Sequence, residues 1–209
     1  MKIIADTHFG HENILKYESI RIKAYKEAGY NNFDKFLVDR LNSFLNDNDK
    51  IYHLGDVAFK DGYKYASKLK GNYTLIVGNH DKMKHLEYYK SLGWNIIENI
   101  DIRVSYDKKL LHYLKRFKIK TACIIEDIGD KRILFSHYPI SNDNPYDEKY
   151  KENTELLEFL FHTLNCDINI HGHTHSYTIK NKRCINACVE VNEFKPINLA
   201  KLLSSSSQT

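Results

Sequence analysis

The histidines of the segment His171-Gly172-His173-Thr174-His175 have a spacing that suits a metal site. Imidazoles at alternate positions around a glycine can point toward one small space. The run Ile168-Asn169-Ile170 before them predicts a short buried strand over 167–170, and Gly172 lets the backbone turn sharply where that strand ends. We therefore expect these histidines at a strand-to-loop edge, where they could bind a metal ion.

Four further polar clusters also follow predicted strands. Asp6 and His8 follow a strand over 3–5, Asp56 follows 50–54, Asn79 and His80 follow 73–77, and His137 follows 132–136. In open α/β sheets, sites are built at the edge where strands end. Carboxylate, amide and imidazole ligands without thiolates suit divalent ions such as Mn²⁺, Fe²⁺ or Zn²⁺. These ligands exceed what one ion needs, so the pattern indicates two ions that share a bridging carboxylate.

The elements around these clusters alternate at first between strand and helix. Apolar residues at helical spacing predict helices over 33–45, with Asn32 as the cap, and over 63–69 and 85–92, followed by a strand over 95–97. Beyond Ile100, extended segments are predicted over 100–105, 119–126 and 132–136, and helices over 109–117 and 154–164. After His175, the segments 177–179 and 183–191 are expected to form a hairpin.

The composition predicts one soluble domain. The chain has 209 residues, only 3 Pro, 42% hydrophobic and 28% charged residues, and a mean hydropathy of −0.53. We expect one domain over 1–203 and a disordered tail over 204–209. Without an apolar span or a signal peptide, the chain is expected to be cytoplasmic, with no membrane partner and with reduced cysteines. The oligomeric state stays open.

A basic segment interrupts this domain around residues 105–122. The net charge of +4 is mild, but from Lys108 to Ile125 no acidic residue occurs, and the cations of Lys108–Lys120 alternate with Tyr113 and Phe117. Such a run is usually a solvated surface. A contact with nucleic acid is the alternative that we keep.

The five clusters occur in chain order as D-x-H, G-D, G-N-H-D, S-H-Y-P and G-H-T-H, from Asp6 to His175. Each motif alone has little specificity, but the ordered series resembles the calcineurin-like metallophosphoesterase superfamily. The resemblance implies an α/β fold in which two mixed β-sheets pack as a sandwich flanked by helices. It also implies a dinuclear metal centre between the strand-end loops.

The resemblance assigns a role to each motif residue. One ion would be held by Asp6, His8, Asp56 and His175, and the other by Asp56, Asn79, His137 and His173, with Asp56 bridging. His80 would face the phosphate and the leaving group, and Asp81 would orient His80. We expect Mn²⁺ first, with Fe²⁺, Zn²⁺ or Ni²⁺ as alternatives. Such ions lower the pKa of a shared water toward ~7.

Residues beside the motifs are expected to have lesser roles. His11 could touch the substrate or support His8, and we give equal weight to a structural role. His53 and His171 precede ligand motifs and are expected to be packed or to support the ligands. Asn13 and Arg21 follow the first motif and could line the cleft, but we expect a solvated loop.

The resemblance predicts a phosphoester hydrolase. Our first hypothesis is a phosphodiesterase that acts on a nucleotide, a cyclic nucleotide or an oligonucleotide. A phosphomonoesterase and a catalytically silent scaffold for protein partners are the alternatives. The complete ligand set and the presence of His80 favour catalysis. Gly55-Asp56 is followed by Val57-Ala58-Phe59 and not by a G-D-x-V-D-R-G pattern, which disfavours a Ser/Thr protein phosphatase.

Overall fold

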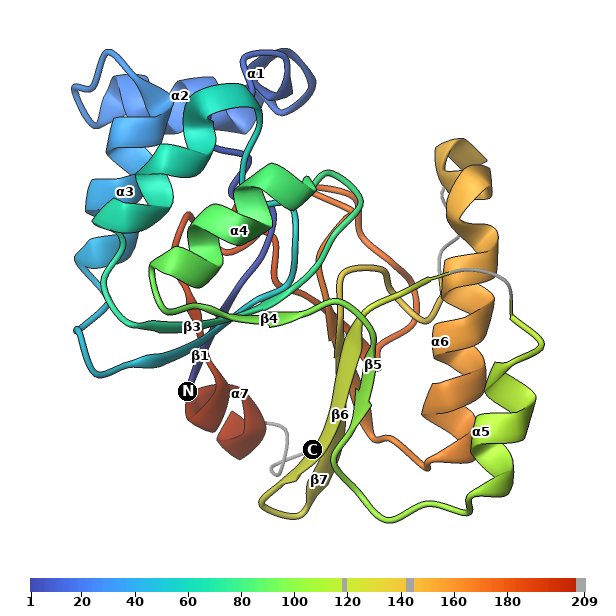
Figure 1. Ribbon diagram of the computed structural model, residues 1–209. Helices are drawn as coiled ribbons and strands as arrows, with labels where there is room; N and C mark the ends of the chain where they lie inside the picture. Colours follow the sequence, from blue (N-terminus) through green and yellow to red (C-terminus); the bar gives the residue numbers. More distant parts are fainter. Residues whose placement is uncertain (118–119, 142–144, 206–209) are drawn as a thin grey trace.

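The computed structural model of this protein describes residues 1–117, 120–141 and 145–205, whose strands form two five-stranded sheets (Figure 1). In order across the first sheet lie β10 (Ile197–Asn198), β1 (Lys2–Ile4), β2 (Lys50–His53), β3 (Asn72–Ile76) and β4 (Asn95–Ile97). In this sheet, β1 to β4 are parallel, and β10 is antiparallel to β1.

The second sheet is mixed as well. Its order is β5 (Ile100–Ile102), β6 (Cys123–Ile128), β7 (Lys131–Ser136), β8 (Ile168–His171) and β9 (Cys184–Asn186). Strands β6 and β7 pair antiparallel, and the other neighbours pair parallel. The predicted α/β class with two mixed sheets is therefore confirmed.

Helices cover the outer faces of both sheets (Figure 1). Beside the first sheet lie α1 (Ile14–Tyr17), α2 (Ser19–Glu27), α3 (Phe33–Asn42), the 3-10 helix η1 (Lys60–Lys68) and α4 (Met83–Ser91). Beside the second lie α5 (Lys109–Leu114) and α6 (Lys151–Thr163), which follows the 3-10 helix η2 (Pro145–Tyr150), while α7 (Leu199–Ser205) ends the described chain. Asn32 caps α3 as predicted, since its side chain accepts a hydrogen bond from the Lys35 N–H at 2.9 Å.

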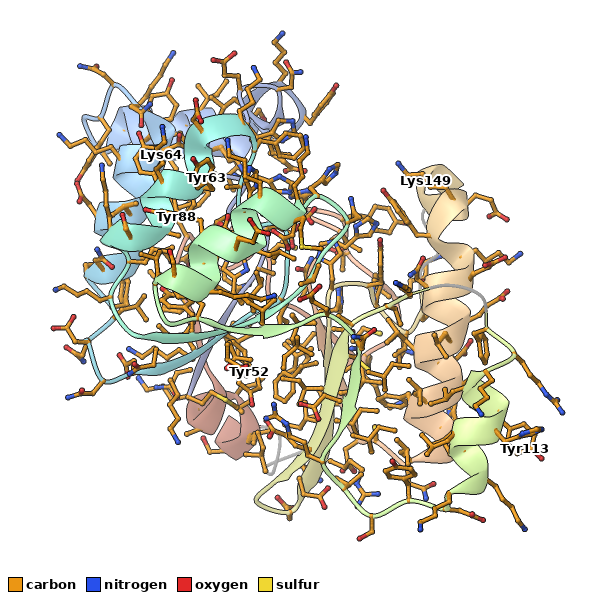
Figure 2. The ribbon with its side chains drawn as sticks, viewed as in Figure 1. Tyr52, Tyr63, Lys64, Tyr88, Tyr113 and Lys149 are labelled. Atoms are coloured by element: carbon orange, nitrogen blue, oxygen red, sulfur yellow. The ribbon has the colours of Figure 1, made fainter. Side chains whose placement is uncertain are left out.

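Alternate strand residues build separate cores on the two faces of each sheet. Ile3 and Ile124 lie in the core between the sheets, while Ile4 packs under the helices of the first sheet and Ile125 under those of the second. Tyr52 lies between the sheets (Figure 2), with its ring edge-to-face on Phe135 at 5.1 Å. Burial of this apolar surface joins the sheets into one sandwich.

Several sequence predictions differ from the structure. The hairpin over 177–191 is wrong, because the segment contributes only β9, which pairs in parallel with β8. Arg21 lies in α2 and is fully buried, where we expected a solvated loop. Ser204 belongs to α7 and not to a disordered tail, while residues 206–209 lie outside the described chain. None of the described helices has both the length and the apolar character needed to cross a membrane.

The basic segment lies beside α6. Its exposed cations on and around α5 include Lys109, Lys115 and Arg116, whereas Lys118 lies outside the described residues. The neighbouring helix α6 exposes Glu152, Glu155 and Glu158. These glutamates lower the positive potential that a polyanion would meet at this surface.

Candidate metal centre

Five strand-end loops converge at one edge of the sandwich and bring the predicted ligands together. The loops follow β1, β2 and β3 of the first sheet and β7 and β8 of the second. A hydrogen bond joins the two sheets here, because Leu54 O, after β2, accepts from His137 Nδ1, after β7, at 2.9 Å. Within the second sheet, His137 O accepts from the Gly172 N–H, after β8, at 2.9 Å. The ligands therefore lie where the ends of both sheets meet.

One group of side chains gathers around Asp6. Its Oδ1 atom lies 3.5 Å from His8 Nε2 and 3.9 Å from His175 Nε2. Asp6 and His8 are buried, and His175 is partly exposed. Three ligand atoms of the kinds that bind divalent ions are thus within reach of one cation.

A second group surrounds His137. Its Nε2 atom lies 2.8 Å from Asn79 Oδ1, 3.3 Å from His173 Nδ1 and 3.6 Å from Asp56 Oδ2. Because His137 Nδ1 donates to the Leu54 carbonyl, its Nε2 keeps the lone pair that a metal ligand needs.

Asp56 lies between the two groups. Its Oδ2 atom is 3.6 Å from His8 Nε2 in the first group and 3.6 Å from His137 Nε2 in the second. Its other oxygen, Oδ1, accepts a hydrogen bond from the His80 N–H at 2.8 Å. One carboxylate oxygen therefore faces candidate ligands of both groups.

The electrostatics of the cluster fit divalent ions. Asp6 Oδ1 and both ring nitrogens of His8 are buried without a hydrogen-bond partner among the described residues. Burial and the charges of Asp6 and Asp81 raise the pKa of Asp56 well above its usual value. Burial lowers the pKa of His8 to about 4 and of His137 to about 3, so both are neutral ligands near pH 7. A cation would satisfy the unpaired atoms and favour the ionised carboxylates.

The backbone of the cluster is strained. Asp6, His8, Asp56, His173 and His175 have φ values of 56°, 49°, 57°, 69° and 47°, in the left-handed region that non-glycine residues seldom adopt. Each such residue costs on the order of 1–3 kcal/mol, and such strain clusters at functional sites. Two glycines allow the close approach of the loops. A Cβ on Gly78 would lie 2.3 Å from Asp56 Oδ1, and one on Gly172 would lie 2.4 Å from Asp6 Oδ2.

Asp81 holds the loops after β2 and β3 together. Its Oδ2 accepts from the N–H groups of Asp56 and Gly78, each at 2.9 Å, and its Oδ1 accepts from the Val57 N–H at 3.0 Å. The resemblance implied that Asp81 orients the His80 ring. Its hydrogen bonds instead fix the backbone that carries Asp56.

His80 and two aromatic neighbours, Phe59 and His11, lie beside Asp56, and we call this group the mouth of the centre. The His80 side chain is 43% exposed, and its Nε2 lies 4.0 Å from Asp56 Oδ2. Its ring is 4.8 Å from Phe59, which stacks on His11 at 3.9 Å with an interplanar angle of 8°. Phe59, which sequence reasoning missed, thus joins His11 to the candidate catalytic histidine.

Two tyrosines and a lysine lie near His173, in the second group of side chains. The rings of Tyr138 and Tyr150 lie 4.7 Å and 4.8 Å from the His173 ring. Lys149 lies over Tyr150 at 4.6 Å, next to the start of α6 (Figure 2). Tyr138 belongs to the S-H-Y-P motif and could have been predicted, whereas no motif indicated Tyr150 or Lys149.

His53 and His171 are packed beneath the ligands. Both are fully buried, and His53 Nε2 lies 3.0 Å from Thr7 Oγ1. His171 Nδ1 lies 2.8 Å from the Gly172 carbonyl. These contacts agree with the supporting or packed role expected from the sequence.

Known proteins resemble this chain in sequence and fold. The chain matches the calcineurin-like phosphoesterase superfamily domain over residues 1–192. A solved structure of a protein of unknown function, AQ665 from Aquifex aeolicus, is 30% identical with a TM-score of 0.70, over 98% of this chain and 97% of that one. The uncharacterized protein MJ1445 of Methanocaldococcus jannaschii is 30% identical over 122 residues. That match covers 53% of this chain and 65% of MJ1445, which is less than two thirds of its length. With the ligand cluster at the sheet edge and a match across most of its length, the chain belongs to the calcineurin-like phosphoesterase superfamily.

Proposed function

We propose that this protein is a dinuclear metal-dependent phosphodiesterase that acts on nucleotide-like esters. Membership of the superfamily supports hydrolysis of phosphoesters. The observation that carries the dinuclear proposal is the position of Asp56 Oδ2, which is 3.6 Å from a ligand atom of each group. A carboxylate in this position can bridge two ions.

The donor set supports Mn²⁺ as the first candidate. Carboxylate and amide oxygens together with imidazole nitrogens suit Mn²⁺, and Fe²⁺, Zn²⁺ and Ni²⁺ are the alternatives. Asp6, His8 and His175 would hold one ion, Asn79, His137 and His173 the other, and Asp56 both. When bound, the ions would polarise the phosphoryl oxygens and supply an activated water near neutral pH.

The residues at the mouth would act on the ester itself. Burial lowers the pKa of His80 to about 4, so its ring is neutral near pH 7 and can donate one N–H. Half-exposed beside Asp56, His80 can reach the leaving oxygen and stabilise the negative charge that develops on it. Asp81 keeps Asp56 in place through the backbone. Phe59 and His11, whose rings lie beside His80, would shield one side of the centre from water.

The cations and aromatic rings at the mouth favour a phosphodiester that carries a nucleobase. Among the described cations, Arg21 is buried and paired with Glu190. After burial and other charges, Lys149 contributes to the lowered pKa of His80 and Lys60 to that of His11, so these two cations lie near the mouth. A mouth with few cations suits the single charge of a diester better than the −1.5 to about −2 of a monoester. Stacking of a base on an aromatic ring contributes about 1–3 kcal/mol, so the rings of Phe59 and His11 support a nucleotide-like substrate.

Initial rates on matched esters test the proposal. Purified protein is supplied with Mn²⁺, Ni²⁺ or Zn²⁺ and assayed with bis(p-nitrophenyl) phosphate and p-nitrophenyl phosphate. We expect kcat/KM to be at least roughly tenfold higher on the diester, a difference of about 1.4 kcal/mol. A reversed ratio would identify a phosphomonoesterase. Metal binding without hydrolysis of either ester would support the scaffold alternative. His162→Ala, an exposed histidine on α6, serves as the control for His80→Ala.

A further inference from the structure

A fully buried ion pair stands behind one half of the metal centre. Arg21 of α2 and Glu190, which follows β9, are both fully buried at their side chains. Arg21 Nε donates to Glu190 Oε1 at 2.7 Å, and Nη2 also contacts that oxygen. Removing two charges from water is costly. The contacts that the pair makes beyond itself therefore indicate what it does.

The pair contacts the loops of two ligands. Glu190 Oε1 accepts from His175 Nδ1 at 3.0 Å. Arg21 Nη2 donates to the Asp6 carbonyl at 2.6 Å, and Nη1 donates to the Thr7 carbonyl at 2.9 Å. One guanidinium thus fixes the backbone of Asp6 directly and the ring of His175 through Glu190.

Glu190 also sets the tautomer of His175. An ionised carboxylate can only accept, so His175 Nδ1 donates to it, and Nε2, 3.9 Å from Asp6 Oδ1, is the nitrogen left to bind a metal ion. Histidine ligands of metals commonly donate their other N–H to a carboxylate, which orients the ring and strengthens the ligand. His137, in the second group, donates instead to the neutral carbonyl of Leu54. The two groups are therefore supported in different ways.

We propose that Arg21 and Glu190 are positioning residues for the ion held by Asp6, His8 and His175, and that the ion beside His137 does not depend on them. This proposal rests on the dinuclear centre of the proposed function. It assigns helix α2 to one half of the centre, because α2 supplies the cation that keeps Glu190 ionised and that holds the Asp6 loop. Arg21 can do this from a single position because its planar fork donates to several acceptors at once.

Metal titration of two glutamate variants tests this assignment. Glu190→Gln keeps the side-chain shape but removes the charge. Glu193→Gln is the matched control, because Glu193 is exposed and pairs only with Lys195 among its described ionic contacts. Mn²⁺ binding to the metal-free proteins is measured by calorimetry and by metal content after gel filtration. We expect Glu190→Gln to weaken one of two Mn²⁺ binding events by roughly 10–100-fold and to leave the other unchanged. Glu193→Gln should match the wild type.

A second pair of variants separates positioning from folding. Arg21→Lys keeps the charge but loses the fork, so it should weaken the same binding event less than Arg21→Met does. Urea unfolding of each variant in EDTA shows whether the fold is retained. Equal weakening of both binding events by Glu190→Gln, or no weakening, would overturn the proposal. A single Mn²⁺ site in the wild type would instead contradict the dinuclear centre, so the two failures are distinguishable.

Discussion

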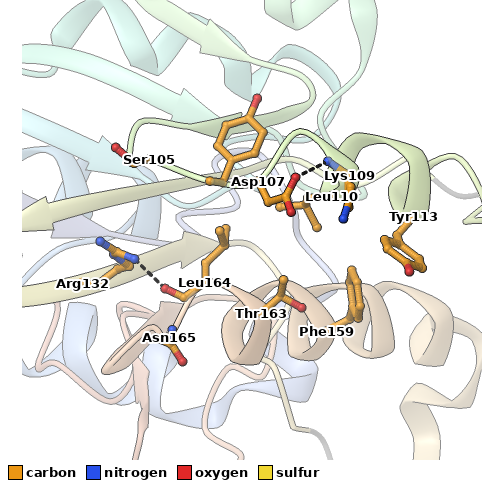
Figure 3. A pocket seen from close by; sticks show the side chains of 11 residues that line it. Ser105, Asp107, Lys109, Leu110, Tyr113, Arg132, Phe159, Thr163, Leu164 and Asn165 are labelled. Atoms are coloured by element: carbon orange, nitrogen blue, oxygen red, sulfur yellow. Dashed lines mark hydrogen bonds between the residues drawn. The ribbon is translucent and has the colours of Figure 1, made fainter.

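The metal centre and the cavity between α5 and α6 differ in how their polar groups are satisfied. The cavity measures about 500 Å³ and is lined by aromatic and polar side chains (Figure 3). In it, Arg132 Nη1 donates to Leu164 O at 2.7 Å, and Asp107 Oδ1 accepts from the Lys109 N–H at 2.9 Å. At the metal centre, by contrast, Asp6 Oδ1 and His8 Nε2 are buried and unpaired among the described residues.

The backbones of the two regions differ in the same sense. Five candidate ligand residues of the candidate metal centre adopt left-handed φ values, whereas among the residues lining the cavity only Asn165 does, with φ 52°. Strain and unpaired buried groups persist only where a bound group or the surrounding structure compensates for them. Buried polar atoms without hydrogen-bond partners therefore indicate a functional site better than cavity volume does.

The largest expected effect lies at the carboxylate shared by both ligand groups. Asp56→Asn should lower kcat/KM by roughly 10³-fold or more, because metal-ion stabilisation of the transition state contributes several kcal/mol. Chelation with EDTA should abolish activity, and His11→Ala should cost less than Asp56→Asn. Rates and bound metal are measured together on each variant. Full activity of metal-free Asp56→Asn would show that hydrolysis does not depend on the metal centre.

His80 should give a graded effect that depends on the leaving group. His80→Asn should keep the metal ions and lose about 10²–10⁴-fold on an alkyl or ribose ester, whose leaving oxygen needs a proton or a hydrogen bond. It should lose distinctly less on a nitrophenyl ester, because nitrophenolate departs without a proton. The same two substrates are compared in wild type and in His162→Ala. Equal losses on both would mean that His80 mainly binds the phosphoryl oxygens.

The buried histidines beneath the centre should make the metal-free protein sensitive to acid. Burial lowers the pKa of His53 to about 3 and of His171 to about 4, against 6.5 when unfolded. As the pH falls below about 6.5, these histidines become protonated in the unfolded chain but stay neutral in the folded chain. The free energy of unfolding therefore decreases. Each histidine lowers the free energy of unfolding by up to about 1.4 kcal/mol per pH unit, until the pH reaches the pKa of that histidine in the folded protein.

Urea unfolding of EDTA-treated protein between pH 7 and pH 4 measures this decrease. His53→Gln should reduce the pH slope, while His162→Ala, at an exposed position, should not. An unchanged pH slope in His53→Gln would contradict the burial of a neutral His53.

The smallest expected effect lies beside the cavity. If the cations around α5 guide a polyanion, reversing Lys115 and Arg116 to Glu should weaken oligonucleotide hydrolysis, more at low salt than at high salt, and leave a small chromogenic diester untouched. Since α6 exposes glutamates nearby, we expect less than about a tenfold effect, or 1.4 kcal/mol. A loss of kcat/KM as large as that of Asp56→Asn would contradict a minor role for the basic segment.

Much of the site could be predicted because its signals are local. Each ligand motif follows an apolar strand, and parallel strands deliver their ends to one edge. Arg21 could not be assigned in this way. It is buried against partners that include Glu190, which lies 169 positions away in the sequence. The parallel pairing of β9 with β8 and the closing elements β10 and α7 were also missed, because partner choice between strands is set by tertiary packing and not by local sequence.

The electron paramagnetic resonance spectrum of the Mn²⁺-loaded protein, together with a count of bound ions, tests whether Asp56 bridges two metal ions. We expect two Mn²⁺ per chain and a spectrum of exchange-coupled ions, because Asp56 Oδ2 faces both ligand groups. In Asp56→Asn the coupling should disappear and at least one ion should be lost. A single ion per chain, or two uncoupled ions in the wild type, would contradict the bridged dinuclear centre.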